Sequence, residues 1–115
     1  MVKYLMGIDA GLTNTKIVVF DFEGRQISAS SKPHETINPR SSWVEGDQEK
    51  LWSNIADGIL ETIQDAGIDP SEIGSIGFAG FGLGLYMVDK RGGAVRNAVC
   101  SNDNRAVEIT ESLKK

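Results

Sequence analysis

The 115-residue chain is long enough for one compact domain, and its 40% hydrophobic and 24% charged residues are typical of a globular protein. A net charge of −4, with scattered lysines and arginines, gives no reason to expect a nucleic acid or an anionic membrane as partner. The single Cys100 excludes an internal disulfide and a cysteine-rich metal site. We expect a cytoplasmic protein, because a free thiol suits a reducing compartment and no apolar run resembles a signal core or a membrane span.

Three short strands open the chain. Apolar and β-branched residues predict strands over residues 4–8, 15–20 and 26–31. Their connections are short and rich in turn-forming residues, as in antiparallel hairpins. We therefore expect a three-stranded meander at the start of the fold.

A long helix follows an irregular segment. Residues 32–46 contain two prolines, two Ser residues and one Asn, so we expect no regular structure there. Asp47 is placed to cap a helix that ends near Ala66, and Gly67 suits a left-handed C-terminal stop. The residues expected on its buried face recur every fourth position, with two more widening the stripe: Leu51, Ile55, Ile59, Ile63, Trp52 and Leu60.

The last third alternates apolar runs with glycine turns. Residues 73–79 predict a strand in the centre of the sheet, followed by a glycine-dense loop over residues 80–84. Residues 85–88 and 94–100 predict a hairpin, and a final helix is expected from Asp103 or Asn104. The order of elements predicts an α/β fold in which a long crossover helix leads the fourth strand into the same sheet.

The loop after the first strand is a candidate phosphate site. A strand that ends in Asp9 and continues into a tight loop of Gly, Thr and Asn points backbone N–H groups and hydroxyls at one place, which favours an anion. Asp9 repels phosphate but can hold a magnesium ion through water, and Lys16 can supply a cation. The alternative is a plain hairpin loop in which Asp9 accepts backbone hydrogen bonds.

Four segments resemble one family. Residues 7–16 (GIDAGLTNTK) and the strand after them resemble the first phosphate motif of the superfamily of sugar kinases, hexokinases, actin and heat-shock ATPases. Residues 43–47 (WVEGD) with the following Leu-Trp pair, residues 76–89, and residues 98–106 (AVCSNDNRA) are similar to later motifs of the FGGY carbohydrate kinases, closest to their L-xylulose kinase-like branch. The resemblance covers nearly the whole chain in order. It implies a ribonuclease H-like fold, ATP, magnesium and phosphoryl transfer to a sugar or polyol hydroxyl. For a kinase of this family we expect a mixed sheet in the strand order 3-2-1-4, with the Asp9 loop beside the Gly80 loop at one end.

The resemblance assigns roles to individual residues. Asp9 would organise magnesium, and the residues facing the ATP phosphates would be Gly11, Thr13, Asn14 and Lys16. The residues on the sugar side would be Phe81, Gly82, Leu83, Asn102, Asp103 and Arg105. Leu83 departs from the family at a position that is usually polar, and Phe81 stands where His or Gln is common, which suggests a ring against the sugar.

The length of the chain also departs from the family. FGGY kinases have two lobes and are several times longer, and their catalytic aspartate lies beyond the matched segment. We therefore expect residues 1–115 to be the single, incomplete N-terminal part of the first lobe of a kinase for a pentulose such as L-xylulose, inactive alone. The alternative is a catalytically dead, stand-alone interaction module of the same fold. Either form should expose apolar surface and self-associate.

Several residues have simpler interpretations. Asp103 is expected to cap the final helix, a role compatible with the sugar side, and Arg105 is as well suited to pair with Asp103 as to touch a substrate. His34 is expected in solvent and Cys100 buried and inert. Packing rather than stacking on a ligand is expected of Trp43 and Trp52. The glycines of residues 80–84 do not indicate a dinucleotide site, because no helix follows them.

Overall fold

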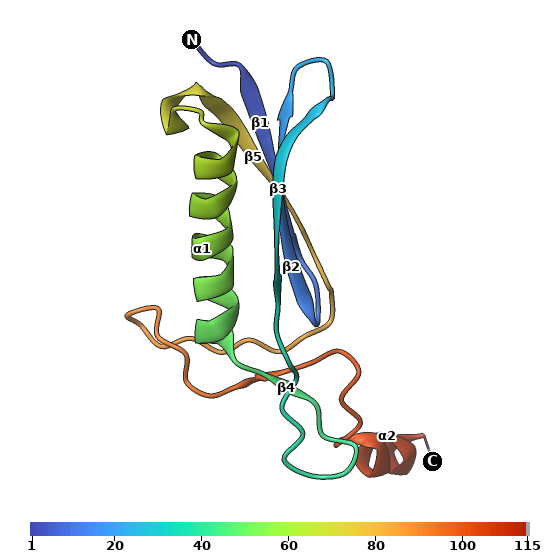
Figure 1. Ribbon diagram of the computed structural model, residues 1–115. Coiled ribbons are helices and arrows are strands. Elements are labelled where there is room, and N and C mark those ends of the chain that lie inside the picture. Colours follow the sequence, from blue (N-terminus) through green and yellow to red (C-terminus); the bar gives the residue numbers. More distant parts are fainter. Residues whose placement is uncertain (115) are drawn as a thin grey trace.

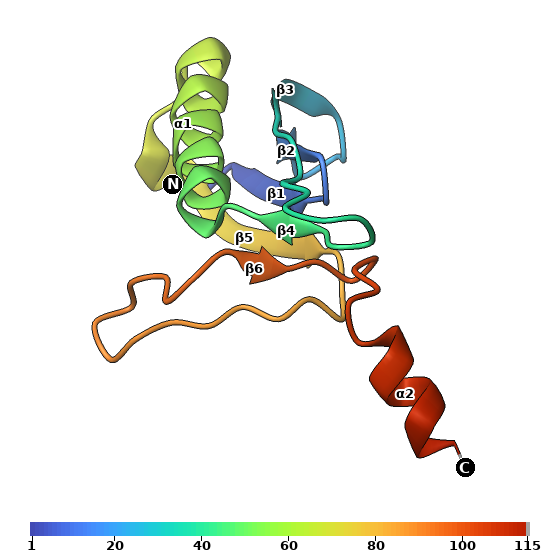
Figure 2. The same ribbon diagram turned by 90° about the horizontal axis from the view of Figure 1, so that it is seen from below.

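The computed structural model describes residues 1–114, in which one long helix covers one face of a four-stranded sheet (Figures 1 and 2). The strands are β1 (Tyr4–Ala10), β2 (Asn14–Asp21), β3 (Gln26–Pro33) and β5 (Ile73–Gly80). Their order is β3-β2-β1-β5, with β1, β2 and β3 antiparallel in sequence and β5 parallel to β1. The predicted α/β class, mixed sheet and strand order are confirmed.

Helix α1 (Gln48–Ala66) supplies the crossover that a parallel β1–β5 pair requires. The Asp47 carboxylate accepts a hydrogen bond from the backbone N–H of Lys50, and Gly67 ends the helix in the left-handed region with φ of 63°. Both helix-end predictions are confirmed. A short 3₁₀ helix, η1 (Pro70–Glu72), then turns the chain into β5.

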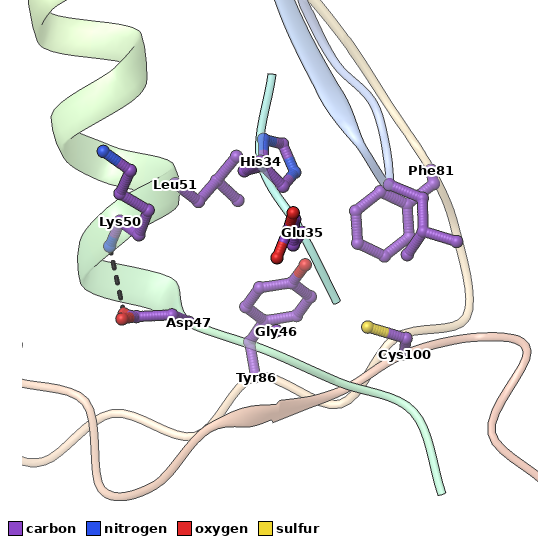
Figure 3. Close-up of a pocket in the computed structure, with 10 residues that line it drawn as sticks. His34, Glu35, Gly46, Asp47, Lys50, Leu51, Phe81, Tyr86 and Cys100 are labelled. Atoms are coloured by element: carbon purple, nitrogen blue, oxygen red, sulfur yellow. Dashed lines mark hydrogen bonds between the residues drawn. The ribbon is translucent and has the colours of Figure 1, made fainter. Parts of the chain in front are cut away.

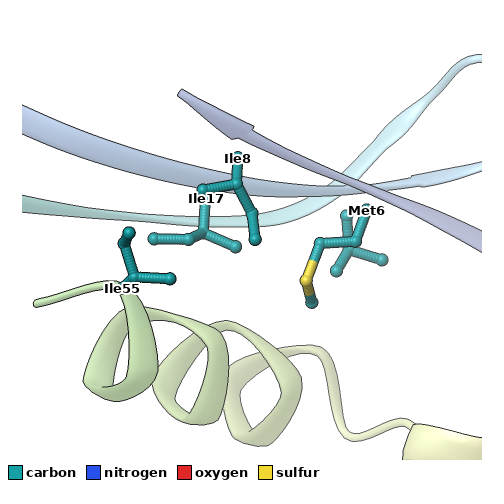
Figure 4. Packing of buried hydrophobic residues seen from close by; sticks show 5 residues of the cluster. Met6, Ile8, Ile17 and Ile55 are labelled. Atoms are coloured by element: carbon teal, nitrogen blue, oxygen red, sulfur yellow. The ribbon is translucent and has the colours of Figure 1, made fainter. Parts of the chain in front are cut away.

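The core lies between α1 and the sheet (Figure 4), with Met6, Ile8, Ile17, Val19 and Ile55 as its most buried apolar residues. Alternate residues of β1 and β2 point at the helix, as the pleat of a half-covered strand requires.

Two residues of the predicted helix face were placed wrongly. Trp52 is 66% exposed and Leu60 is 57% exposed. The helix is instead rotated about its axis toward β3, where the hydroxyls of Ser28 and Ser30 donate hydrogen bonds to α1 carbonyl groups. The α1 residues that this rotation buries are polar or small: Asn54, Gly58 and Thr62.

The fourth strand is not in the centre of the sheet. β5 lies parallel beside β1 at the edge, as the order 3-2-1-4 requires, so the separate expectation of a central strand is wrong, and most residues of β5 are exposed. An uncharged apolar run is typical of a strand covered on both faces. Within residues 1–114, α1 covers mainly β2 and β3 and leaves β5 largely open.

The last third is less regular than its sequence pattern. The hairpin expected over residues 85–100 is reduced to two isolated bridges, Leu85–Val99 and Val88–Ala94. Its second arm instead forms β6 (Ala98–Val99), which pairs antiparallel with β4 (Glu45–Gly46), in the segment expected to be irregular. Figure 1 shows β4 of this two-stranded sheet below the end of the main sheet.

Helix α2 (Val107–Leu113) begins several residues later than expected and projects from the end of the molecule (Figure 1). Its N-cap is Ala106 and no side chain caps it, so the capping role predicted for Asp103 is wrong. The Asp103 carboxylate has other partners, described below. Within residues 1–114, no helix combines the length and the apolarity that crossing a membrane needs.

Candidate functional site

The loop between β1 and β2 is tight and anchored at both sides. The Gly11 N–H donates to the Asn14 carbonyl at 2.9 Å, and a Cβ on Gly11 would lie only 2.8 Å from that oxygen. The backbone N–H of His34 donates to the Thr13 carbonyl at 2.9 Å, which ties the loop to the end of β3. The loop therefore has little room for a side chain at Gly11 and a defined shape.

Asn14 is oriented by a neighbour. Its Oδ1 accepts a hydrogen bond from the Ser31 hydroxyl at 2.8 Å, which leaves the amide NH₂ as a donor on an exposed residue. The Thr13 side chain is exposed beside it. The loop thus offers donors to an anion.

Asp9 and Lys16 face each other across the β1–β2 ladder. Their neighbours Ile8 and Ile17 are buried under α1, so Asp9 and Lys16 point to the opposite face of the sheet. There they line an open depression of about 410 Å³, whose other walls are mostly apolar: Gly7, Ile8, Val18, Phe20, Gly77, Phe78 and Ala79. A carboxylate and an ammonium group therefore stand together at the edge of an open apolar surface.

The donor set suits a magnesium ion shared with a phosphate better than a closed metal site. No group of three His, Cys, Asp or Glu side chains within residues 1–114 is placed to hold a metal by itself. Magnesium commonly keeps several waters and takes one or two carboxylates plus phosphate oxygens. The exposed Asp9 fits that role.

The glycine-dense loop lies next to the first loop, as predicted. Gly80 pairs with Ala10 in the parallel ladder, and the Phe81 N–H donates to the Ala10 carbonyl at 3.4 Å. The Phe81 ring packs at a tilt on the Tyr86 ring, with 6.1 Å between centroids. Leu83 is 98% exposed and has a φ of 64°, a left-handed backbone that is uncommon for a residue other than glycine. The loop thus presents apolar side chains beside the β1–β2 loop.

A small, partly open cavity is lined in part by Leu12 and Phe81 of these two loops (Figure 3). It measures about 30 Å³, which is room for a water molecule and not for a sugar. His34 lines it and is partly buried, with Nδ1 3.5 Å from the Asn54 amide, so the prediction of a solvent-exposed His34 is wrong. Cys100 also lines it and is buried as predicted, and burial raises the pKa of its thiol.

Asp103 and Arg105, predicted on the sugar side, are bound to each other. Arg105 Nη2 lies 2.8 Å from Asp103 Oδ2, and Asp103 also accepts the Val44 N–H at 2.6 Å. The guanidinium group stacks 3.9 Å above the centre of the Trp43 ring. Hydrogen bonds from Arg105 hold the pKa of the Asp103 carboxyl far below its usual range. Both charges are satisfied internally, whereas Asn102 is exposed.

Glu45 joins this cluster and was missed as a site residue. Its Oε1 lies 2.7 Å from Arg96 and 2.9 Å from Arg105, and Asn97 donates to its Oε2 at 3.3 Å. The residue is 5% exposed, and the bond from Arg105 lowers the pKa of its carboxyl. Its place in the WVEGD motif was the available signal, but its partners are more than 50 residues away in the sequence.

Comparison with known proteins points to one family. The N-terminal domain of the FGGY family of carbohydrate kinases matches residues 4–115. Glycerol kinase of Beutenbergia cavernae is 33% identical over 114 residues, covering 98% of this chain and 23% of that protein.

Solved structures share the fold. The ligand-bound xylulose kinase of Lactobacillus acidophilus superposes with a TM-score of 0.89 at 26% identity, over 98% of this chain and 22% of that one. Gluconate kinase of the same organism gives 0.89 at 25% identity, over 99% and 23%. The chain thus spans about a quarter of the length of the relatives it matches. With a family match that runs from β1 to the end of the chain, and with that family's fold around the two adjacent loops, the chain belongs to the FGGY family of carbohydrate kinases.

Proposed function

We propose that this protein acts in the ATP-dependent transfer of a phosphoryl group to a hydroxyl of a sugar or polyol. The observation that carries the proposal is the contact between two loops at one end of the sheet, where Gly80 pairs with Ala10 directly after Asp9. This contact puts a candidate phosphate loop beside a candidate sugar loop. Phosphoryl transfer depends on such positioning and on charge neutralisation.

The phosphate side would use the first loop. Asp9 would hold a magnesium ion, which would supply positive charge against the phosphates. The Asn14 amide, set by Ser31, and the loop N–H groups would donate to the phosphates, and Lys16 would add a positive charge. Thr13 would add an exposed hydroxyl and Gly11 the close backbone approach.

The sugar side would use the loop of residues 80–84 together with Asn102. Phe81 and Leu83 offer apolar contact to the carbon face of a sugar rather than hydrogen bonds to its hydroxyls. We favour a pentulose such as L-xylulose, on the resemblance of residues 82–86 and 101–106 to that branch. The relatives are named as kinases of glycerol, xylulose and gluconate, and these names indicate the chemical class of the substrate.

Residues 1–115 would supply the phosphate loop and part of the sugar site to a larger kinase and would be inactive alone, because half a cleft excludes little water. A cytoplasmic location belongs to the proposal, since the free thiol of Cys100 suits a reducing compartment.

The second candidate is an interaction module that keeps the fold without catalysis. The exposed Leu83 favours it. This position is expected to contact the sugar, but a leucine side chain cannot hydrogen-bond to a sugar hydroxyl. This candidate predicts no turnover from any form of the protein.

A coupled assay separates the two candidates. The protein made from the complete reading frame is tested with ATP, magnesium and a panel of pentuloses, glycerol and gluconate. The kinase proposal expects turnover that Asp9→Ala abolishes and that Asp57→Ala, on the exposed side of α1, leaves intact. Absence of turnover with every substrate, or full activity of Asp9→Ala, would contradict it.

A further inference from the structure

We propose that Glu45 is a positioning residue that holds the two sugar-side segments, residues 80–85 and residues 100–105, in register with each other. The inference rests on the proposed function for its kinetic consequence, but its structural half can be tested without activity. It also reassigns Asp103 and Arg105 from contact with a substrate to support of the segment that carries Asn102.

The Glu45 carboxylate is the hub of a buried charged cluster. Arg96 and Arg105 both donate to its Oε1, at 2.7 and 2.9 Å, and Arg105 in turn binds the Asp103 carboxylate. The side chains of Glu45 and Asp103 are 7% and 3% exposed. Two guanidinium groups thus converge on one oxygen, and without its negative charge they would repel each other.

Hydrogen bonds of the backbone before β4 also hold residues 100–105 in place. The Cys100 N–H donates to the Val44 carbonyl at 2.9 Å, and the Val44 N–H donates to Asp103 at 2.6 Å. The Asn104 N–H donates to the Ser42 carbonyl at 2.9 Å. The segment that precedes β4 therefore holds the turn around Asn102 in position.

The same residue reaches the glycine-dense loop through one strand. Glu45 pairs with Val99 in the β4–β6 ladder. Val99 exchanges two backbone hydrogen bonds with Leu85, at 2.9 and 3.0 Å, and Leu85 ends the loop whose other end is held by Ala10. A shift of β6 relative to β4 would therefore move both sugar-side segments while leaving the first loop in place.

Hydrogen exchange on the 115-residue chain tests the structural half. Glu45→Gln keeps the shape of the side chain and removes its charge. We expect the amides of Val99 and Leu85 to exchange faster by about tenfold or more, while those of Ile17 and Val19 in the core stay protected. The matched control is Glu61→Gln, which breaks the Lys32–Glu61 ion pair between α1 and β3.

Unchanged exchange at Val99 and Leu85 in Glu45→Gln would overturn the proposal. An equal acceleration of these two amides by Glu61→Gln would overturn it as well. If Glu45→Gln loosens the whole chain, Arg96→Gln decides, because Arg96 is 43% exposed and its loss is milder. Faster exchange confined to Val99 and Leu85 in that variant supports the proposal, and no local change overturns it.

Kinetics of the protein from the complete reading frame test the functional half. Glu45→Gln should raise the KM for the sugar by up to about 100-fold, the scale of a small misplacement of substrate contacts, with the KM for ATP unchanged. A merely structural role would change the amount of active enzyme and neither KM. Equal rises in both KM values would overturn the proposal. Wild-type protein with no turnover, but with local loosening in Glu45→Gln, would refute the kinase proposal and leave the positioning role standing.

Discussion

Gly11 is the residue whose size matters most in the first loop. A Cβ at this position would lie 2.8 Å from the Asn14 backbone carbonyl, which cannot swing away as a side-chain tip can. We predict that Gly11→Ala displaces the loop and lowers kcat/KM for ATP on the order of 100-fold, because phosphate donors must be placed within a fraction of an ångström. The measurement is steady-state kinetics of the protein from the complete reading frame.

Gly46→Ala is the matched control for that prediction. Its Cβ would meet only the Cys100 sulfur at 3.5 Å, an ordinary contact. The circular dichroism spectrum of Gly11→Ala should match that of the wild type. Normal ATP kinetics in this variant would show that the loop does not hold the phosphates.

At the residue scale, sequence reasoning worked where a role depends on neighbours in the chain. Asp47 and Gly67 could be assigned because helix ends are local. Asp103 and Arg105 matched a sugar-side pattern, but their partners Val44 and Glu45 lie about 60 residues earlier and decide where their charges go. His34 was misplaced for the same reason, since only the fold brings Asn54 against its ring.

Helix α1 is the element that supports the loop end of the sheet, and its start depends on one cap. The Asp47 carboxylate accepts the Lys50 N–H at 3.0 Å. We predict that Asp47→Ala lowers the free energy of unfolding by about 1 kcal/mol, the usual cost of losing such a cap. Thermal unfolding should show a midpoint lower by about 4 °C. Asp57→Ala, within the same helix, is the control, and an equal loss there would contradict the capping role.

At the element scale, agreement among independent signals decided what could be predicted. The three-stranded meander and α1 each had turn residues, propensity and apolar period pointing the same way. β4 and β6 have two residues each and form only because residues 45–46 meet residues 98–99 in space. No local pattern contains that contact. The rotation of α1 that exposes Trp52 could not be predicted from the sequence either, because hydrogen bonds from the β3 hydroxyls determine it.

For the molecule as a whole, the unusual feature is the open edge formed by β5. Within residues 1–114 no strand pairs with its outer side, and residues 73–80 carry no charge. Ile76 is 49% exposed and Phe78 is 68% exposed. Native sheets commonly protect such edges with charged residues, proline or a covering element. An uncharged open edge with exposed apolar side chains favours association with another chain.

We therefore predict that the 115-residue chain self-associates, and that Phe78→Lys shifts it toward the monomer by placing a charge on the edge strand. Sedimentation velocity over a range of concentrations measures the change. Phe22→Lys is the matched control, because Phe22 is 61% exposed but lies in the β2–β3 turn, away from β5. A wild-type chain that stays monomeric at high concentration would contradict the prediction. Equal dissociation by both variants would place the contact elsewhere, since added positive charge anywhere on the surface would then account for it.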